Sequence, residues 1–421
     1  MKPNISISLL DFSTALSQVL DLASFELAQH QLRTAFLAWR VAEELGMDTN
    51  QQAEIIFSSL LHDVGAMTPE EKFDLHEGTY EENIHLHCEY GAKILQDLPL
   101  FERSAGIIRF HHTDWQDWET KKSPELMLLS QTVYLADLVE REIDRDQFIL
   151  HQDNEIIKTF SDQSGSTFHP EVVEAFKSAA SKEDFWLNCV SPNLLYFLRE
   201  NAPGHAARIQ EAELIAVSEV VRKLIDFRSS FTATHSTGVS TAARLIAESM
   251  GFSEDQLDMI QFAGNLHDVG KLVIPNRILE KPDKLSWEEY ALIRQHSYFT
   301  SLFMRECKLP RYLVDWASLH HERLNGQGYP FHFAEMEISM GSRIIAAADV
   351  LIALAEERPY RHALDKKHVL SELNKMVESS HLDRDIVSLL ESQYEDFVEP
   401  TLEKQREAAR FFSEEKSMMN I

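Results

Sequence analysis

A set of seven residues that could bind metal ions occurs twice in this chain, in the same order and at similar spacing. The second set consists of His235, His267, Asp268, His296, His320, His321 and Asp349. The first set consists of His30, His62, Asp63, His87, His111, His112 and Asp137. Corresponding residues are separated by 205 to 212 positions. A whole ligand set that recurs in this way predicts two related metal-binding domains in one chain.

The residue types also indicate a chemistry. Imidazole and carboxylate side chains are the usual protein ligands of first-row divalent metals. In an adjacent pair such as His267-Asp268, the carboxylate can bridge two metals while the imidazole binds one of them. A dinuclear site of this kind activates water and clamps phosphoryl oxygens, which is the chemistry of phosphodiester hydrolysis.

The elements that must position these residues are predicted to be helices. Gly and Pro are sparse and period-two alternation is rare, so we expect an all-α protein. In the first half, a helix from His30 would stop at Gly46, and the next helix would deliver His62-Asp63. Its predicted N-cap is Thr49, with Gln52 as the capping-box partner.

The second half repeats these helix start and stop signals. The helix after His235 would stop at Gly251, and Ser253 with Gln256 would form the next capping box before His267-Asp268. The repeating unit is therefore a large helical domain rather than a short solenoid repeat.

The boundary between the two domains is expected in the polar, helix-breaking segment 201–204. We therefore expect one domain at residues 1–200 and another at 205–421. An amphipathic helix over 209–228 would connect them, and it could pack the domains together or mediate a homodimer.

The net charge of −28 argues against a broad basic surface of the kind used to bind nucleic-acid polymers or anionic membranes. A phosphate substrate would need a local positive site, which bound metals could supply. No uncharged apolar run reaches the length of a membrane span, and the N-terminus lacks a signal-peptide pattern. We expect a cytoplasmic protein.

The three cysteines, Cys88, Cys189 and Cys307, are scattered, which favours neither a disulfide framework nor a thiolate zinc site. Cys88 follows His87 and could be a redox-sensitive neighbour of a metal, but we favour its interpretation as a reduced, small hydrophobic residue.

Four further motifs accompany the second ligand set in order along the chain. They are H-D-V-G-K (267–271), the loop V-I-P-N-R-I-L-E-K-P-D-K-L (273–285), H-H-E-R-L-N-G-Q-G-Y-P (320–330), and A-D-V followed by R-P-Y-R (358–361). Through these motifs, residues of about 210–400 resemble an HD-GYP domain, a subgroup of the HD phosphohydrolase superfamily.

This resemblance implies an all-helical domain that hydrolyses cyclic dinucleotides, either cyclic di-GMP to pGpG or 3′,3′-cyclic GMP-AMP to a linear dinucleotide. The second set of seven residues would bind the metals. Asp268 would bridge them and orient the attacking hydroxide, while Lys271, Arg358 and Arg361 would hold phosphates. The loop beside the site would be shaped by Gly328, Tyr329 and Pro330.

One position departs from the family pattern. Members with three metals carry a Glu four residues before the first His, and this chain has Phe231 there. We therefore expect two divalent metals, with iron or manganese first and nickel, cobalt, magnesium or zinc as alternatives.

Residues of about 20–145 resemble the same HD core without its G-Y-P segment. Here Glu26 does lie four residues before His30, so a second metal site could combine Glu26 with the first set of seven. However, Ala66 stands where the other half has Lys271, and no R-P-Y-R follows Asp137. We expect a regulatory or ligand-sensing domain.

The leading hypothesis is a metal-dependent cyclic-dinucleotide phosphodiesterase. The alternative is a receptor that binds a cyclic dinucleotide without hydrolysing it, which Phe231 and the degenerate first half would motivate. Another HD phosphohydrolase, such as a nucleotidase, is disfavoured by the G-Y-P segment. The expected partners are a cyclic dinucleotide and a second copy of the chain, with no nucleic-acid polymer and no membrane.

Overall fold

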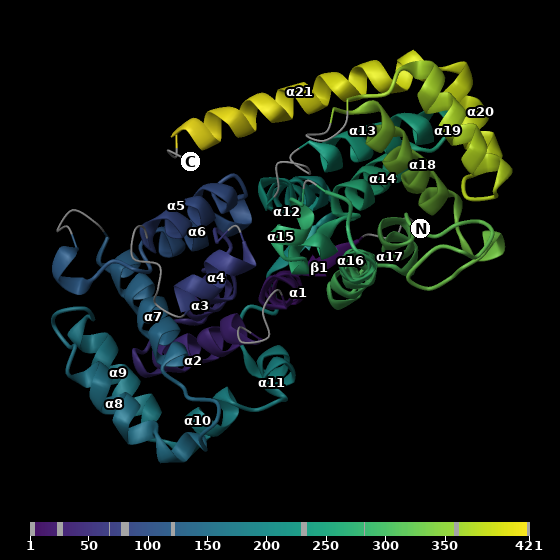
Figure 1. Cartoon of the computed structure of the whole chain (residues 1–421). Helices are drawn as coiled ribbons and strands as arrows, with labels where there is room; N and C mark the ends of the chain where they lie inside the picture. The colour runs from purple at the N-terminus through teal and green to yellow at the C-terminus, as the bar shows by residue number, and fades with distance from the viewer. Residues whose placement is uncertain are drawn as a thin grey trace. The chain divides into compact units, whose positions relative to one another are not determined.

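The chain folds into two compact units, Met1–Gln210 and Glu211–Ile421 (Figure 1). The computed structural model describes residues 5–22, 28–66, 68–76, 84–118, 123–228, 234–281, 283–357 and 362–418. Both units are helical, as expected, with one short sheet. In that sheet β1 (Ser6–Ser8) pairs antiparallel with β2 (Arg208–Gln210), so the two ends of the first unit lie side by side.

The helices of the first unit are α1 (Leu9–Asp21), α2 (His30–Glu44), α3 (Thr49–Leu61), α4 (Pro69–His76), α5 (Ile84–Leu95), α6 (Glu102–Arg109), α7 (Pro124–Arg141), α8 (Asp153–Ser161), α9 (Pro170–Ala180), α10 (Glu183–Cys189) and α11 (Leu194–Asn201). Short 3-10 helices lie at Pro99–Phe101, Trp115–Asp117 and Ile149–His151. Helix α2 packs against α3, α7 and α9, and buries Leu32 and Phe36 among them.

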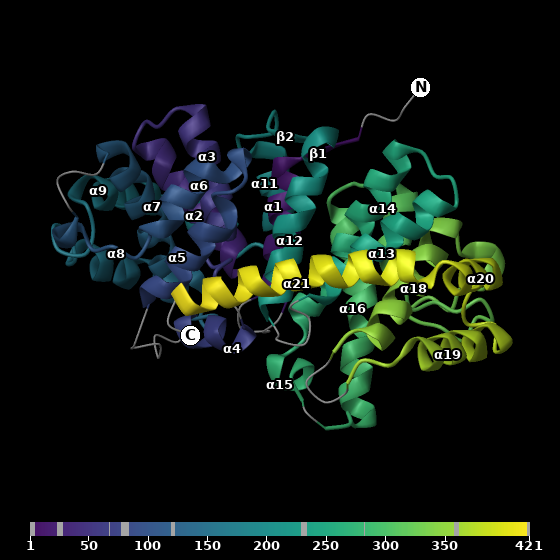
Figure 2. The same ribbon diagram turned by 90° about the horizontal axis from the view of Figure 1, so that it is seen from above.

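The helices of the second unit are α12 (Leu214–Arg228), α13 (His235–Ser249), α14 (Glu254–Leu266), α15 (Asn276–Leu279), α16 (Trp287–Glu306), α17 (Arg311–Ser318), α18 (Met340–Ala355), α19 (Lys366–Glu378), α20 (Arg384–Ser392) and α21 (Tyr394–Met418). Short 3-10 helices lie at Glu211–Glu213, Val269–Val273 and Glu335–Glu337. Helix α13 packs against α14, α18 and α21, and Figure 2 shows α21 running along it.

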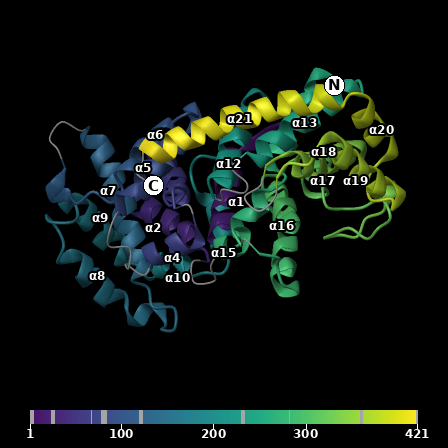
Figure 3. The ribbon, with the colours of Figure 1, turned by 45° about the horizontal axis from the view of Figure 1, so that its top comes forward.

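The two units use their helices in the same way. Helix α13 takes the place of α2, α14 that of α3, and α18 that of α7, because the same pairs pack together in each unit. In the second unit α17 packs against both α16 and α18, and the three helices lie close together in Figure 3. A repeated ligand set therefore lies on a repeated helical framework.

One predicted helix start is wrong by one residue. The N-cap of α3 is Asp48, whose carboxylate accepts the N–H groups of Asn50 at 2.8 Å and Gln51 at 3.0 Å. Gln51 rather than Gln52 completes the capping box. Asp and Thr are both good N-caps, so Asp48 takes the role from the predicted Thr49. The second prediction is confirmed, since Ser253 and Gln256 form the box that starts α14.

A glycine after each His-Asp pair lets two helices approach closely. A Cβ atom at Gly270 would lie 1.9 Å from the carbonyl oxygen of His296, and one at Gly65 would lie 2.0 Å from that of His87. Because only glycine fits here, the turn after the His-Asp pair contacts the backbone of the helix that carries the next ligand.

None of the helices in the described part of the chain is both long enough and apolar enough to cross a bilayer.

Candidate metal centre

The seven predicted ligands of the second unit converge on one buried point. His235 is the first residue of α13, His267 and Asp268 follow α14, and His296 lies in α16. His320 and His321 follow α17, and Asp349 lies in α18. His321 is the most accessible, with 31% of its side chain exposed, so the centre is approached from its side.

The donor atoms form two groups of three, His235 with His267 and Asp268, and His296 with His320 and His321. Within each group the donor atoms lie within 4.8 Å of one another. Two carboxylates, Asp349 and Asp268, face both groups: Asp349 Oδ1 lies 3.0 Å from His235 Nε2, and its Oδ2 lies 3.9 Å from His321 Nδ1. Asp268 Oδ2 lies 3.1 Å from His267 Nε2, while its Oδ1 lies 3.4 Å from His296 Nε2. This arrangement suits a carboxylate that bridges two cations.

Hydrogen bonds to the backbone fix the tautomer of three of these histidines. In His267, His296 and His320, Nδ1 lies 2.6–2.9 Å from the carbonyl oxygen three residues earlier. A carbonyl can only accept, so Nδ1 carries the proton and Nε2 presents a lone pair to the centre. The Nε2 atoms of His296 and His320 then face each other at 3.1 Å with no proton between them.

Two lone pairs held face to face in a buried site repel each other unless a cation lies between them. His267 Nε2 and Asp268 Oδ1 are likewise buried without a hydrogen-bond partner among the residues that the structure describes. Such orphaned polar atoms are costly in a protein interior. The donor set therefore fits divalent metal ions.

The first unit builds a related centre. His30 Nε2 lies 3.3 Å from His62 Nε2, and His87 Nε2 lies 3.3 Å from His111 Nε2. Asp63 lies between the pairs, with Oδ1 3.6 Å from His87 Nε2 and Oδ2 3.7 Å from His30 Nε2. The two other predicted ligands also lie in this cluster: the His112 ring packs on His111, and Asp137 Oδ1 lies 3.2 Å from His30 Nε2.

Two family models, both described as an HD domain, match the chain, one over residues 27–142 and the other over 219–386. The chain belongs to the HD-domain family. Its two copies, the first and the second HD domain, each contain one of the two clusters.

Several characterised proteins are similar to this tandem of HD domains. A 3′3′-cGAMP-specific phosphodiesterase of Vibrio cholerae is 27% identical over 387 residues, which is 89% of each chain. A cyclic di-GMP phosphodiesterase of Thermotoga maritima is 35% identical over 182 residues, covering 43% of this chain and 50% of its own. The crystal structure of V-cGAP3 from V. cholerae matches 92% of this chain and 98% of its own, with a TM-score of 0.63 at 22% identity, so the helical fold is shared.

Burial and charge within the second HD domain shift the pKa values of several predicted ligands. Burial tends to raise the pKa of Asp268, but His267 and Lys271 hold it well below its ordinary value. Burial lowers the pKa of His296 to about 3 and that of His321 to about 4, although nearby carboxylates oppose the change. At neutral pH Asp268 is therefore ionised and His296 and His321 are neutral, the forms in which these side chains bind metals.

His235 is held by a carboxylate that the sequence analysis missed. Glu356 Oε1 lies 3.0 Å from His235 Nδ1, and Glu356 Oε2 accepts a hydrogen bond of 2.9 Å from Gln405 in α21. Burial tends to lower the pKa of His235, but Glu356 and Asp349 raise it to about 9. A carboxylate behind a ligating histidine orients the ring and makes it a stronger ligand.

The same support recurs in the first HD domain. Glu140 pairs with His30 Nδ1, and its other oxygen accepts from Arg33 at 2.6 Å and Arg145 at 2.8 Å. Acidic residues are abundant in this chain, so neither Glu140 nor Glu356 stands out in the sequence. The one available signal was their position just after the Asp of each ligand set, near the end of the same helix.

Some of the predicted substrate-binding residues lie beside the centre. Lys271 Nζ lies 2.5 Å from Asp268 Oδ2, so in this structure it neutralises a ligand. The Tyr329 ring packs on His321 at 4.8 Å, on the accessible side, and precedes Pro330 in a cis peptide bond. Gly328 is needed there, because a Cβ atom would lie 2.4 Å from the backbone of Glu322. Arg358, Arg361, Phe231 and Glu26 lie outside the described residues.

An arginine that the sequence analysis did not single out also borders the accessible side. The guanidinium of Arg294 lies 5.9 Å from the ring centre of Tyr329 and 5.7 Å from that of Tyr290. Its Nε is buried and makes no hydrogen bond within the described residues. Arg294 thus places a positive charge next to the tyrosine that covers His321.

One cavity of the second HD domain is separate from the centre. It has a volume of about 600 Å³, lies between α12, α13, α14 and α21, and is lined by residues such as Arg222, Thr241, Asn265 and Lys404. None of the seven ligands lines it, so it is not the site of the predicted chemistry.

Proposed function

We propose that the second HD domain hydrolyses a phosphodiester bond of a cyclic dinucleotide. The observation that carries the proposal is the buried double cluster, in which Asp268 faces both groups of histidines and His321 leaves one side accessible. The relatives support the substrate class. The relative aligned over 89% of this chain is named for 3′3′-cGAMP, so that substrate comes first and cyclic di-GMP second.

The second HD domain would hold two divalent metals, iron or manganese first, through the seven residues of its cluster. When bound, such metals activate water and stabilise charge on the phosphoryl oxygens. Asp268 would keep the two histidine groups in a common geometry. The backbone carbonyls behind His267, His296 and His320 would keep each Nε2 aimed inward.

The substrate would enter past His321. Arg294 and Lys271 would supply positive charge to its phosphates, because both lie beside the cluster in a chain of net charge −28. Lys271 must leave Asp268 to do so, which a metal at the Asp268 carboxylate would favour. Arg358 and Arg361 remain proposed phosphate contacts on the motif alone. Tyr329 and Pro330 would shield the accessible side from bulk water.

The test is turnover of the purified full chain, prepared without oxygen and loaded with iron or manganese, on 3′3′-cGAMP and cyclic di-GMP. Linear products are detected directly. His267→Ala with Asp268→Ala should lower turnover by about three orders of magnitude or more, since metal activation is worth several kcal/mol. The matched control is His62→Ala with Asp63→Ala, which changes the same positions of the first HD domain and should keep turnover measurable.

Tight binding of both dinucleotides with no product, whichever metal is supplied, would replace the enzyme with a receptor. Full turnover in the His267→Ala, Asp268→Ala variant would refute the site. For the first HD domain we propose a regulatory or ligand-sensing role, because Arg141 already pairs with its Asp137 at 2.8 Å and the G-Y-P segment is absent.

A further inference from the structure

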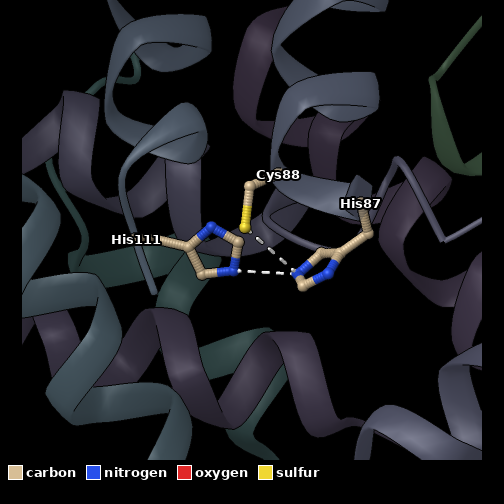
Figure 4. Close-up of side chains that lie close together, drawn as sticks. All are labelled: His87, Cys88 and His111. Carbon is tan, nitrogen blue, oxygen red and sulfur yellow. Dashed lines mark hydrogen bonds between the residues drawn. The ribbon is translucent and has the colours of Figure 1, made fainter. Parts of the chain in front are cut away.

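We infer that Cys88 is a metal ligand of the first HD domain, and that this domain selects a thiophilic divalent cation such as Zn²⁺, unlike the second. From the sequence alone, Cys88 was interpreted as a reduced, small hydrophobic residue. In the structure, Cys88 Sγ lies 3.6 Å from His87 Nε2, which in turn lies 3.3 Å from His111 Nε2. Figure 4 shows the three side chains pointing toward one another, with their donor atoms within 4.8 Å.

The second HD domain provides the internal comparison. Its corresponding group consists of three imidazoles, His296, His320 and His321. The residue after His296 is Ser297, whose Oγ lies 3.2 Å from His296 Nε2. Cys88 therefore puts sulfur where the second domain has a hydroxyl oxygen. Thiolates favour zinc and other thiophilic ions, whereas a hydroxyl is at best a weak ligand.

Orphaned polar atoms around Cys88 independently indicate a cation. His111 Nδ1 donates to the Ile108 carbonyl oxygen at 2.6 Å, so its Nε2 presents a lone pair to His87. His87 Nδ1, both ring nitrogens of His112 and Asp63 Oδ1 are buried with no hydrogen-bond partner in the described part of the chain. Asp63 Oδ1 lies 3.6 Å from His87 Nε2, so this unpartnered oxygen faces the same group.

Asp137, another predicted ligand of the first HD domain, already has a charged partner. Arg141 pairs with Asp137 through Nε at 3.0 Å and Nη2 at 2.8 Å, so that carboxylate already has a cation. The Cys88 thiol lies 3.6 Å from the Ile84 carbonyl oxygen, and burial together with Asp63 and Asp137 raises its pKa, so the thiol needs a bound cation to lose its proton. On binding, the metal forms a bond to Sγ and replaces the thiol proton, which leaves to solvent, and nothing is oxidised or reduced.

The experiment is a Co²⁺ titration of the metal-free full chain, followed by its near-ultraviolet sulfur-to-cobalt charge-transfer band. The chain has three cysteines, so the band can arise from Cys88, Cys189 or Cys307 only. We expect a band in the natural chain, loss of it in Cys88→Ser, and its retention in Cys189→Ser and Cys307→Ser. The two control cysteines are equally buried but belong to none of the donor groups found in the described residues.

Two further measurements keep the result independent of hydrolysis. Cys88→Ser should lower the Zn²⁺ affinity of the first HD domain by at least about ten-fold, since removing even an outer-shell partner of a metal site costs that much. Ser297→Cys should create a second charge-transfer band in the other domain. The absence of a band in the natural chain at saturating Co²⁺ would overturn the inference, and so would its survival in Cys88→Ser. The measurement on the natural chain does not depend on the folding of any variant.

Discussion

Replacing Glu356 by Ala is the perturbation whose effect can be worked out most closely from the structure. Glu356 does not belong to the cluster, yet its Oε1 lies 3.0 Å from His235 Nδ1 and so directs His235 Nε2 toward Asp349 Oδ1, also at 3.0 Å. Without the carboxylate, His235 loses the partner that fixes its tautomer and orientation. Gln405 in α21 loses one of its acceptors and keeps the Thr234 carbonyl oxygen, at 3.0 Å.

The loss should fall in the range measured for outer-shell partners of metal-binding histidines, about 10- to 100-fold in metal affinity. This corresponds to about 1.4 to 2.7 kcal/mol. Part of it is offset near neutral pH. With Glu356 present, the pKa of His235 is about 9, so a metal must displace a proton, whereas a lower pKa in the variant removes that competition. The deficit should therefore grow as the pH rises from 7 toward 9.

The assay is the concentration of iron or manganese that gives half-maximal turnover, measured at several pH values, together with turnover at saturating metal. Glu356→Ala should shift the half-saturating concentration and leave most of the saturated rate. Glu140→Ala is the matched control, because Glu140 holds His30 in the first HD domain in the same way. An unchanged half-saturating concentration in Glu356→Ala, or an equal shift in Glu140→Ala, would refute the assigned role.

Other consequences can be measured more directly. Gly270→Ala should lower the free energy of unfolding by about 1–3 kcal/mol, since its Cβ would lie 1.9 Å from a backbone oxygen. The control Gly106→Ala, whose Cβ would have no neighbour nearer than 3.5 Å, should not lower it. Denaturant titration measures the free energy of unfolding of both variants. Glu322→Ala should speed hydrogen exchange at the amides of 331–333, whose N–H groups its carboxylate accepts at 2.7–3.1 Å, and Glu322→Gln should keep part of the protection. Removing metals with a chelator should lower the Tm, since metal at 100 times its Kd stabilises the folded state by about 2.7 kcal/mol. Restoring the metal should raise the Tm again. Identical melting curves with and without metal would contradict metal binding.

The convergence of the seven predicted ligands could be anticipated from the sequence, because each of them lies at a helix end or on a helix face with a local signal. His235 starts a helix, and His267-Asp268 ends one just before Gly270. The repeat supplied the rest, since two copies with the same spacing imply the same framework. The error at α3 has a local cause: Asp48 and Thr49 are both suitable N-caps, and only the hydrogen bonds distinguish them.

What the sequence could not provide are contacts that depend on tertiary packing. Glu356 and Glu140 are two acids among 68, and only their pairing with His235 and His30 marks them. Lys72 is a similar case. Ala66 stands where the second HD domain has Lys271, so no lysine was expected beside Asp63. In the structure Lys72, from α4, is buried, and its ammonium group helps to hold the pKa of Asp63 low.

The two HD domains therefore differ in which groups neutralise their buried carboxylates, more than in the carboxylates themselves. In the second, Lys271 on a partly accessible side chain neutralises Asp268, and the position four residues after Asp349 is Ala353. In the first, that position is Arg141, which is held against Asp137 with only 10% of its side chain exposed. A partly accessible lysine can yield to a metal or a phosphate, whereas a buried guanidinium that leaves its partner would remain unpaired at high cost. This difference supports the proposal that the second HD domain holds the reactive centre and that the first holds a fixed ion.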